Sequence, residues 1–148
     1  GEASSLQTEP YSAAFNDALS ASYYDVEGAV EAQDVTIFDA RSAGRFSGAE
    51  SEPRPNLPSG HMPGAVNIPF NLLIDSVTGG FKSKDQLRNI FGDSLSVERG
   101  IITTCGSGVT ACVLALALYH LGITARVYDG SWTEWASQPD ASICVLSS

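Results

Sequence analysis

Residues Gly100–Gly122, GIITTCGSGVTACVLALALYHLG, decide the fold of this chain. The first five, Gly100–Thr104, predict a short strand. The run Val109–Leu121 is largely apolar, and it predicts a buried helix that ends at the following glycine. The loop between them begins with a cysteine and carries no charge. A strand that turns into a helix through such a loop is typical of an open α/β sheet, where ligands bind at the carboxyl ends of the strands.

The same alternation of strands and helices extends over the rest of the chain. The patterns predict strands at 19–23, 35–39, 65–69, 100–104 and 125–129, and helices at 25–32, 84–91, 109–121 and from Ser131 onward. Ser83 with Gln86, and Ser131 with Glu134, have the spacing of capping boxes at helix starts. We therefore expect an α/β domain whose central parallel β-sheet has about five strands and is flanked by helices on both faces.

Two stretches fall outside this alternation. Residues 1–19 are polar and without pattern, so we interpret them as a linker or N-terminal tail, with a single domain over residues 20–148. Residues 47–64 form a long proline-rich loop, and loops of this length are often functional.

Composition and charge exclude several classes of partner. The 148 residues carry a net charge of −9, which argues against nucleic acid or an anionic membrane as a partner. The longest apolar run is shorter than the ~20 residues of a membrane span. Three cysteines are an odd number, so at least one thiol is expected to be free, which favours a reducing intracellular compartment.

The loop after the strand has the composition of an anion-binding nest around Cys105. Gly106 and Gly108 permit backbone N–H groups to turn inward, and a helix N-terminus adds positive potential. Such surroundings lower the pKa of a thiol from about 8.5 to ~3.5–7.5. The sequence thus predicts a nucleophilic thiolate, with a buried cysteine on a tight turn as the alternative. A phosphatase-like enzyme is disfavoured, because Ala111 stands where an arginine would hold the phosphate, and no lysine of a P-loop is present.

Three motif blocks resemble the rhodanese superfamily. They are GHMPGAVNIPF (60–70), CGSGVTAC (105–112) and ARVYDGSWTEW (125–135). Together with DARSAGRFSGAESEPRP (39–55), the CGSGVT loop is more narrowly similar to the 3-mercaptopyruvate sulfurtransferases of that superfamily.

The resemblance implies a reaction and a set of site residues. Sulfur would pass from 3-mercaptopyruvate to Cys105 as a persulfide, with release of pyruvate, and then to a thiol such as thioredoxin or to cyanide. Ser107 matches a loop serine implicated in proton relay, and Arg45 and Arg54 match the arginines that bind the substrate. The loop amides expected to hold the persulfide are those of Gly106, Gly108, Val109 and Thr110.

The resemblance also concerns partners and location. It implies a second rhodanese-like domain upstream in the parent chain. From the cysteine spacing and the free thiol we expect no metal and no cofactor, and a cytoplasmic or mitochondrial location. A thiosulfate sulfurtransferase and a non-enzymatic rhodanese binding module remain alternatives. The neutral loop argues against the dianion thiosulfate, and two arginines outside it suit a monoanionic keto acid. Retention of the cysteine argues against the binding module.

The remaining candidate residues are interpreted as structural. We expect an ion pair between Asp39 and Arg41, a turn ordered by His61, and a turn set by Asp129. His120, Cys112 and Trp135 are expected in the core, while Trp132 is a weaker candidate for the substrate pocket. Glu50–Glu52 is expected to be a solvated loop face, and Cys144 has no assigned role.

Overall fold

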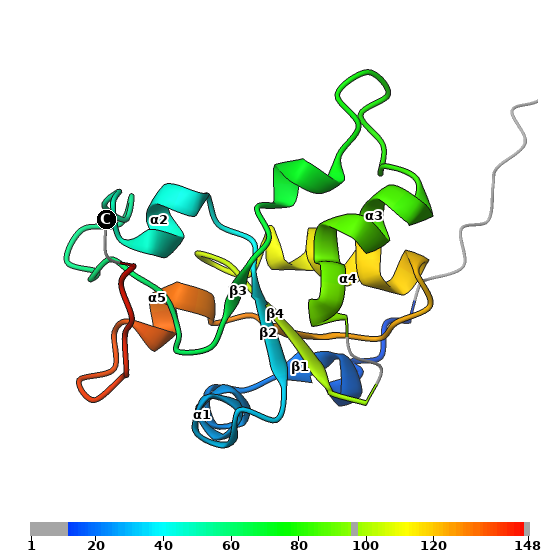
Figure 1. The fold of residues 1–148 in the computed structure, drawn as a ribbon. Helices are drawn as coiled ribbons and strands as arrows, with labels where there is room; N and C mark the ends of the chain where they lie inside the picture. Colours follow the sequence, from blue (N-terminus) through cyan, green and yellow to red (C-terminus); the bar gives the residue numbers. More distant parts are fainter. Residues whose placement is uncertain (1–11, 96–97, 147–148) are drawn as a thin grey trace, which may run out of the picture.

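The computed structural model describes residues 12–95 and 98–146. Its strands are β1 (Ser20–Ala21), β2 (Thr36–Asp39), β3 (Val66–Asn67), β4 (Ile101–Thr104) and β5 (Arg126–Tyr128). Its α-helices are α1 (Tyr23–Ala32), α2 (Ala43–Ser47), α3 (Lys84–Phe91), α4 (Ala111–His120) and α5 (Ser131–Trp135), with short 3₁₀ turns at Asp17–Leu19, Phe70–Leu73 and Gly92–Ser94 (Figure 1).

The strands form one parallel sheet in the order β1-β5-β4-β2-β3. The central pair is in register from Thr36 opposite Ile101 to Asp39 opposite Thr104. All four residues of β4 are buried, as expected for a strand covered on both faces. The predicted five-stranded α/β fold is confirmed, although each strand is shorter than its sequence pattern.

Two apolar cores lie on opposite faces of the sheet. One contains Leu87 and Phe91 of α3 with Leu114 and Leu118 of α4. The other contains Val26 of α1 with both tryptophans of α5. This arrangement fixes the carboxyl ends of β2, β4 and β5 side by side, and the loops that leave them form the site described below (Figure 1).

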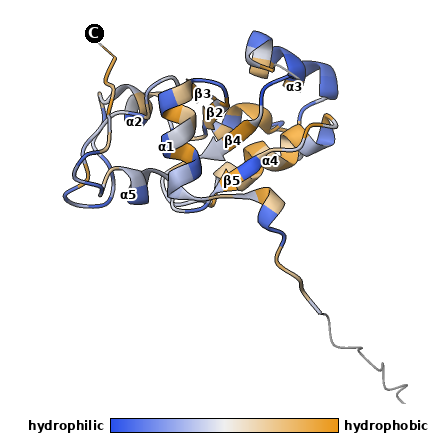
Figure 2. Cartoon of the chain, turned by 90° about the horizontal axis from the view of Figure 1, so that it is seen from below, coloured by the Kyte–Doolittle hydropathy of each residue, from blue (hydrophilic) through white to orange (hydrophobic). Residues whose placement is uncertain are grey.

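Helix α4 differs from the prediction in its start and in its burial. It begins at Ala111, so the preceding residues belong to the loop rather than to the helix. Its outer surface is exposed, with Leu116 57% and Tyr119 72% accessible. Figure 2 shows that α4 is coloured largely as hydrophobic. His120 and Cys112 are also exposed, so their assignment to the core was wrong. An apolar run does not reveal which helical face meets the sheet, and here only one face does.

The two predicted capping boxes had opposite outcomes. Ser83 and Gln86 cap α3 as expected, and the helix ends at Gly92. At α5 the prediction was wrong, because Ser131 is the first helical residue and no side chain caps the helix. The Ser131 hydroxyl is used elsewhere, in the loop of Cys105.

The predicted linker lies partly outside the described residues, which begin at residue 12. Within them, residues 12–16 are irregular and the 3₁₀ turn Asp17–Leu19 leads into β1. No helix in the described part of the chain has the length and apolar character that crossing a membrane requires.

Candidate active site

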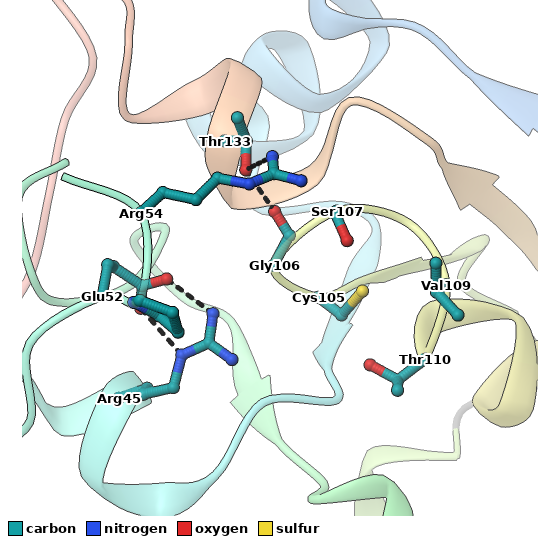
Figure 3. A pocket seen from close by; sticks show the side chains of 10 residues that line it. Arg45, Glu52, Arg54, Cys105, Gly106, Ser107, Val109, Thr110 and Thr133 are labelled. Carbon is teal, nitrogen blue, oxygen red and sulfur yellow. Dashed lines mark hydrogen bonds and ion pairs between the residues drawn. The ribbon is translucent and has the colours of Figure 1, made fainter.

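A pocket opens where β4 ends, and Cys105 lies in it (Figure 3). Its volume is about 260 Å³. It is lined by Arg45, Glu52, Pro53, Arg54, Cys105, Gly106, Ser107, Val109, Thr110 and Thr133. Seven of the eight site residues expected from the sequence therefore line one cavity; the eighth, Gly108, donates its backbone N–H to the Cys105 sulfur.

The Cys105 thiol is buried, yet its pKa is lowered. The residue is 2% exposed, and the Gly108 N–H donates a hydrogen bond to Sγ over 3.1 Å. Burial alone would raise the pKa of this thiol. Hydrogen bonding from the Thr110 hydroxyl and from backbone N–H groups of the loop more than offsets burial, and the pKa lies below its ordinary value. The sulfur is thus held in a site that favours the thiolate.

Gly108 is a position that only glycine fits. Its φ of +88° lies in the left-handed region, and a Cβ there would stand 2.7 Å from the backbone oxygen of Asp129. A side chain would therefore be strained and would also collide with the turn after β5. The conformation of Gly108 is what directs its N–H to the sulfur.

Ser131 joins the cysteine loop to the adjacent strand. Its hydroxyl accepts a hydrogen bond from the Cys105 N–H at 3.0 Å and donates one to the Tyr128 carbonyl at 2.8 Å. Ser131 is fully buried and has a φ of +52°, which is uncommon for a residue other than glycine. The backbone N–H of Trp132 also donates to the Cys105 carbonyl, at 2.9 Å. The backbone of the nucleophile is thus fixed from both sides by the start of α5.

The two predicted arginines reach the pocket from different sides (Figure 3). The Arg45 side chain is 25% exposed, and its guanidinium lies against the loop, since a Cβ on Gly106 would stand 2.7 Å from Nη2. Arg54 donates from Nη1 to the Thr133 hydroxyl at 2.6 Å, and that hydroxyl donates to the Gly106 carbonyl at 2.7 Å. Arg45 thus lies next to the cysteine loop, and Arg54 is connected to it by hydrogen bonds through Thr133.

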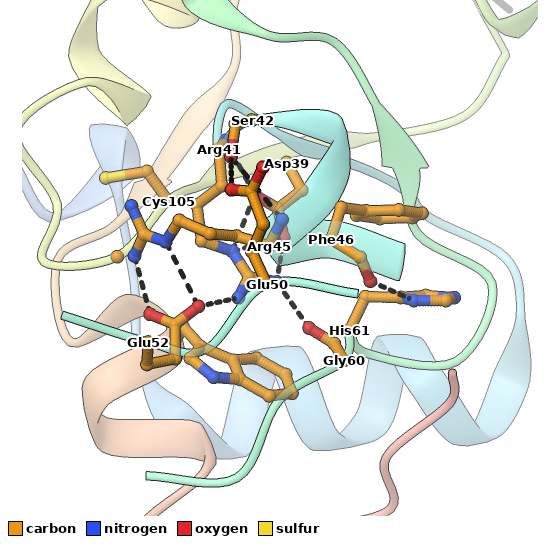
Figure 4. A network of polar contacts seen from close by, with 12 residues as sticks. Asp39, Arg41, Ser42, Arg45, Phe46, Glu50, Glu52, Gly60, His61 and Cys105 are labelled. Carbon is orange, nitrogen blue, oxygen red and sulfur yellow. Dashed lines mark hydrogen bonds and ion pairs between the residues drawn. The ribbon is translucent and has the colours of Figure 1, made fainter. Parts of the chain in front are cut away.

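A buried network behind the pocket positions Arg45 (Figure 4). Glu52 accepts from Arg45 Nε at 3.1 Å and Nη2 at 2.6 Å, and from Arg41 Nη1 at 2.9 Å. Arg41 also pairs with Asp39 at 2.7 Å, donates to the Gly60 carbonyl and lies over the Trp132 ring, with Cζ 4.4 Å from its centroid. The predicted ion pair of Asp39 and Arg41 is confirmed. The prediction of a solvated Glu52 was wrong, because its side chain is only 2% exposed.

Other candidate residues lie outside the pocket. His61 stacks on Phe46 and hydrogen-bonds its carbonyl through Nδ1 at 2.8 Å, in keeping with a structural role. Trp132 does not line the pocket; its indole N–H donates to the Pro58 carbonyl, whereas Trp135 packs in the core as expected. Cys144 is half-buried and pairs through its backbone with His61.

Sequence reasoning missed three residues of the site, namely Glu52, Ser131 and Thr133. Ser131 and Thr133 had a usable signal, because they directly follow β5, whose carboxyl end lies beside that of β4. No group of three or more His, Cys, Asp or Glu side chains suited to a metal ion occurs within residues 12–95 and 98–146.

A parallel α/β domain with a cysteine nest after its central strand is the arrangement of a rhodanese-like domain. The family model of the rhodanese-like domain matches residues 22–138, and the chain therefore belongs to the rhodanese family.

Among individual proteins, the chain is similar to sulfurtransferases. It is 42% identical over 135 residues to the 3-mercaptopyruvate sulfurtransferase of Escherichia coli K12, covering 90% of this chain and 47% of that protein. It is 46% identical over 111 residues to thiosulfate/3-mercaptopyruvate sulfurtransferase 2 of Arabidopsis thaliana, covering 74% and 32%. The crystal structure of the Tum1 protein from Saccharomyces cerevisiae matches with a TM-score of 0.79 at 34% identity, over 88% of this chain and 48% of that one. The chain thus spans half or less of the length of these relatives.

Proposed function

We propose that this chain is the nucleophile-bearing part of a sulfurtransferase that takes sulfur from 3-mercaptopyruvate. The observation that carries the proposal is the thiol of Cys105, whose pKa is lowered in a pocket flanked by Arg45 and Arg54. The names of the relatives support the same chemistry.

The two arginines suit the anionic end of the substrate. Within the described residues, Arg45 Nη1 and Arg54 Nη2 have no hydrogen-bond partner, since Glu52 and Thr133 occupy other nitrogens. A carboxylate and a neighbouring keto oxygen can accept from these donors. The thiol of the substrate would then lie toward Cys105, in a pocket whose volume of about 260 Å³ accommodates a small keto acid.

Sulfur transfer from this position balances without a cofactor. The Cys105 thiolate attacks the substrate sulfur, an S–S bond forms and the C–S bond breaks. The electron pair goes to the carbon, giving the enolate of pyruvate, which takes up a proton. We assign Ser107, exposed at the pocket, to the relay of that proton, and the N–H groups of Gly106 to Thr110 to stabilising the persulfide. A thiol acceptor attacks the outer sulfur and regenerates Cys105.

Thiosulfate is the second candidate donor, because the Arabidopsis relative carries both substrates in its name. The loop from Cys105 to Thr110 has no cationic side chain, and a dianion would gain more from one than a monoanion would. We therefore rank 3-mercaptopyruvate first.

We further propose an upstream rhodanese-like domain in the parent chain, joined through residues 1–19, with residues 20–148 as the catalytic domain. The length of the relatives supports this, since each is at least twice the matched span. A thiol protein such as thioredoxin is the proposed acceptor. A reducing cytoplasm or mitochondrion is the proposed location, and one Arabidopsis relative is named as mitochondrial.

The proposal is tested by the kinetics of pyruvate release from 3-mercaptopyruvate with a small thiol as acceptor. Arg45→Ala and Arg54→Ala should each raise KM, because each removes a charge-assisted hydrogen bond worth about 1.5–3 kcal/mol, or roughly 10- to 150-fold. Arg88→Ala is the control, since Arg88 is an exposed arginine on α3 that pairs with Asp85 and does not line the pocket. An unchanged KM in both pocket variants would remove the arginines from the mechanism, and no pyruvate from the wild type would refute the function.

A further inference from the structure

The carboxylate of Glu52 lines the pocket but takes no part in the proposed reaction. Among the described residues, Glu52 is the one acidic residue that lines the pocket, and its side chain is 2% exposed. A carboxylate so buried persists only with partners that compensate the lost hydration. Both of its oxygens are used, Oε1 by Arg41 and by Nε of Arg45, and Oε2 by Nη2 of Arg45.

The four charged groups of this network cancel one another. Asp39 and Arg41 have side chains at most 1% exposed and pair at 2.7 Å, and Glu52 pairs with Arg45 at 2.6 Å. Two carboxylates therefore balance two guanidinium groups. Of the charged residues that line the pocket, Arg54 alone contributes a charge that no carboxylate within the described residues balances.

The guanidinium of Arg45 interacts with both Glu52 and Cys105. The pKa of Arg45 is raised, first by its hydrogen bond to Glu52 and also by the nearby Cys105 thiolate. Its position against Gly106 places it beside the loop. Glu52 and the Cys105 thiolate therefore share Arg45 as a charged neighbour, and both line the same pocket.

We infer that Glu52 determines the anion selectivity of the site: it fixes Arg45 against the cysteine loop and cancels its charge, so that the pocket accepts a monoanion and discriminates against a dianion. This rests on the proposed sulfur transfer for its substrates, but its electrostatic part concerns any anion that approaches Cys105. Glu52 is a positioning residue, because it acts through Arg45.

The direct test uses two alkylating agents of similar size, iodoacetate and iodoacetamide, which differ in charge. Their rates at Cys105 are read from the labelled peptide by mass spectrometry. Glu52→Gln should raise the ratio of iodoacetate to iodoacetamide rate on the order of three- to tenfold, because a buried negative charge has been removed. Glu52→Asp keeps the charge and should leave the ratio near that of the wild type.

Glu50→Gln is the matched control. Glu50 stands two residues away in the same loop, and its carboxylate accepts from the Ser42 hydroxyl at 3.3 Å rather than from an arginine. It should leave the ratio unchanged. Thermal unfolding of each variant is measured alongside. Arg41 keeps Asp39 and the Gly60 carbonyl as partners in Glu52→Gln, so that variant is expected to fold.

The second arm compares sulfur donors. In Glu52→Gln, kcat/KM for thiosulfate relative to 3-mercaptopyruvate should rise by a similar factor, because a dianion gains twice what a monoanion gains from the same change in potential. An unchanged alkylation ratio in folded Glu52→Gln would overturn the inference, as would a shift of equal size in Glu50→Gln. Absence of sulfur transfer by the wild type would refute the proposed function alone, since the alkylation arm needs no sulfur donor.

Discussion

Two cysteines in one short stretch, Thr104–Cys112, have opposite chemical environments. Cys105 in the loop is 2% exposed and its thiol has a lowered pKa. Cys112, in the first turn of α4, is exposed, yet the pKa of its thiol is raised, first by the partial burial of its sulfur and then by the negative charges of Cys105 and Asp129. The Cys112 thiol donates to the Gly108 carbonyl at 3.4 Å, whereas the Cys105 sulfur accepts from the Gly108 N–H.

The comparison shows that hydrogen-bond donors, rather than exposure, activate the thiol. The N–H of Gly108 donates to the Cys105 sulfur, whereas the carbonyl of the same residue accepts from the Cys112 thiol. An N–H donor stabilises the thiolate, while a carbonyl acceptor stabilises the protonated thiol. The loop therefore selects one nucleophile from two neighbouring cysteines.

The largest expected effect is the loss of activity when the loop cysteine is removed. Cys105→Ser should reduce pyruvate release from 3-mercaptopyruvate to the background rate, because a serine hydroxyl is not ionised at neutral pH and cannot carry the sulfur. Cys112→Ser should retain activity within about twofold, since its thiol makes one weak contact. Equal losses in the two variants would end the distinction between the cysteines.

The next largest effect is expected from a change in the backbone conformation of the loop at Gly108. Gly108→Ala should lower kcat/KM by at least about tenfold, because a left-handed φ costs ~1–2 kcal/mol for alanine and the Cβ collides with Asp129. Gly28→Ala is the control, because Gly28 lies in α1 with no atom within 4 Å of a new Cβ. That change should stabilise the protein by about 0.5–1 kcal/mol in thermal or urea unfolding. A fully active Gly108→Ala variant would contradict the role given to the Gly108 N–H.

The smallest effect is a difference in titration. The thiolate fraction of each cysteine rises as the pH increases through its pKa, so Cys105 should react with iodoacetamide from a lower pH than Cys112. Rates measured peptide by peptide between pH 5 and 10 (roughly the range in which thiols titrate) should give two separate midpoints, with that of Cys105 the lower. Coincident midpoints, or a lower midpoint for Cys112, would reverse the comparison.

Local patterns predicted the elements of the fold well. The β-branched run before Cys105 and the capping box of Ser83 depend on neighbours in sequence, and both occur as expected. The position of Cys105 at the carboxyl end of a strand followed from the same patterns, and the structure shows that this strand is the central one. The pocket residues predicted from motifs, including Arg45 and Arg54, came together because the carboxyl edge of the sheet gathers the loops.

The errors concern interactions between segments far apart in sequence. Ser131 does not cap α5, because the helix begins at Ser131 itself and its hydroxyl accepts from the Cys105 N–H, 26 residues away. The side chain of Glu52 was predicted to be solvated, but it is buried and forms ion pairs with Arg41 and Arg45. Cys112 reads as buried because its helix is apolar on every side, whereas the sheet covers only one of its faces. None of these partners can be recognised from local sequence alone.

The central claim is that the sulfur atom is accepted at Cys105. The most direct measurement is peptide mass spectrometry of the protein after brief exposure to 3-mercaptopyruvate without an acceptor, with free thiols blocked before digestion. The account predicts one additional sulfur atom on the Cys105 peptide, none on those of Cys112 and Cys144, and loss of that atom when a thiol is added. An extra sulfur on Cys112, or a Cys105 peptide of unchanged mass while pyruvate is released, would contradict it.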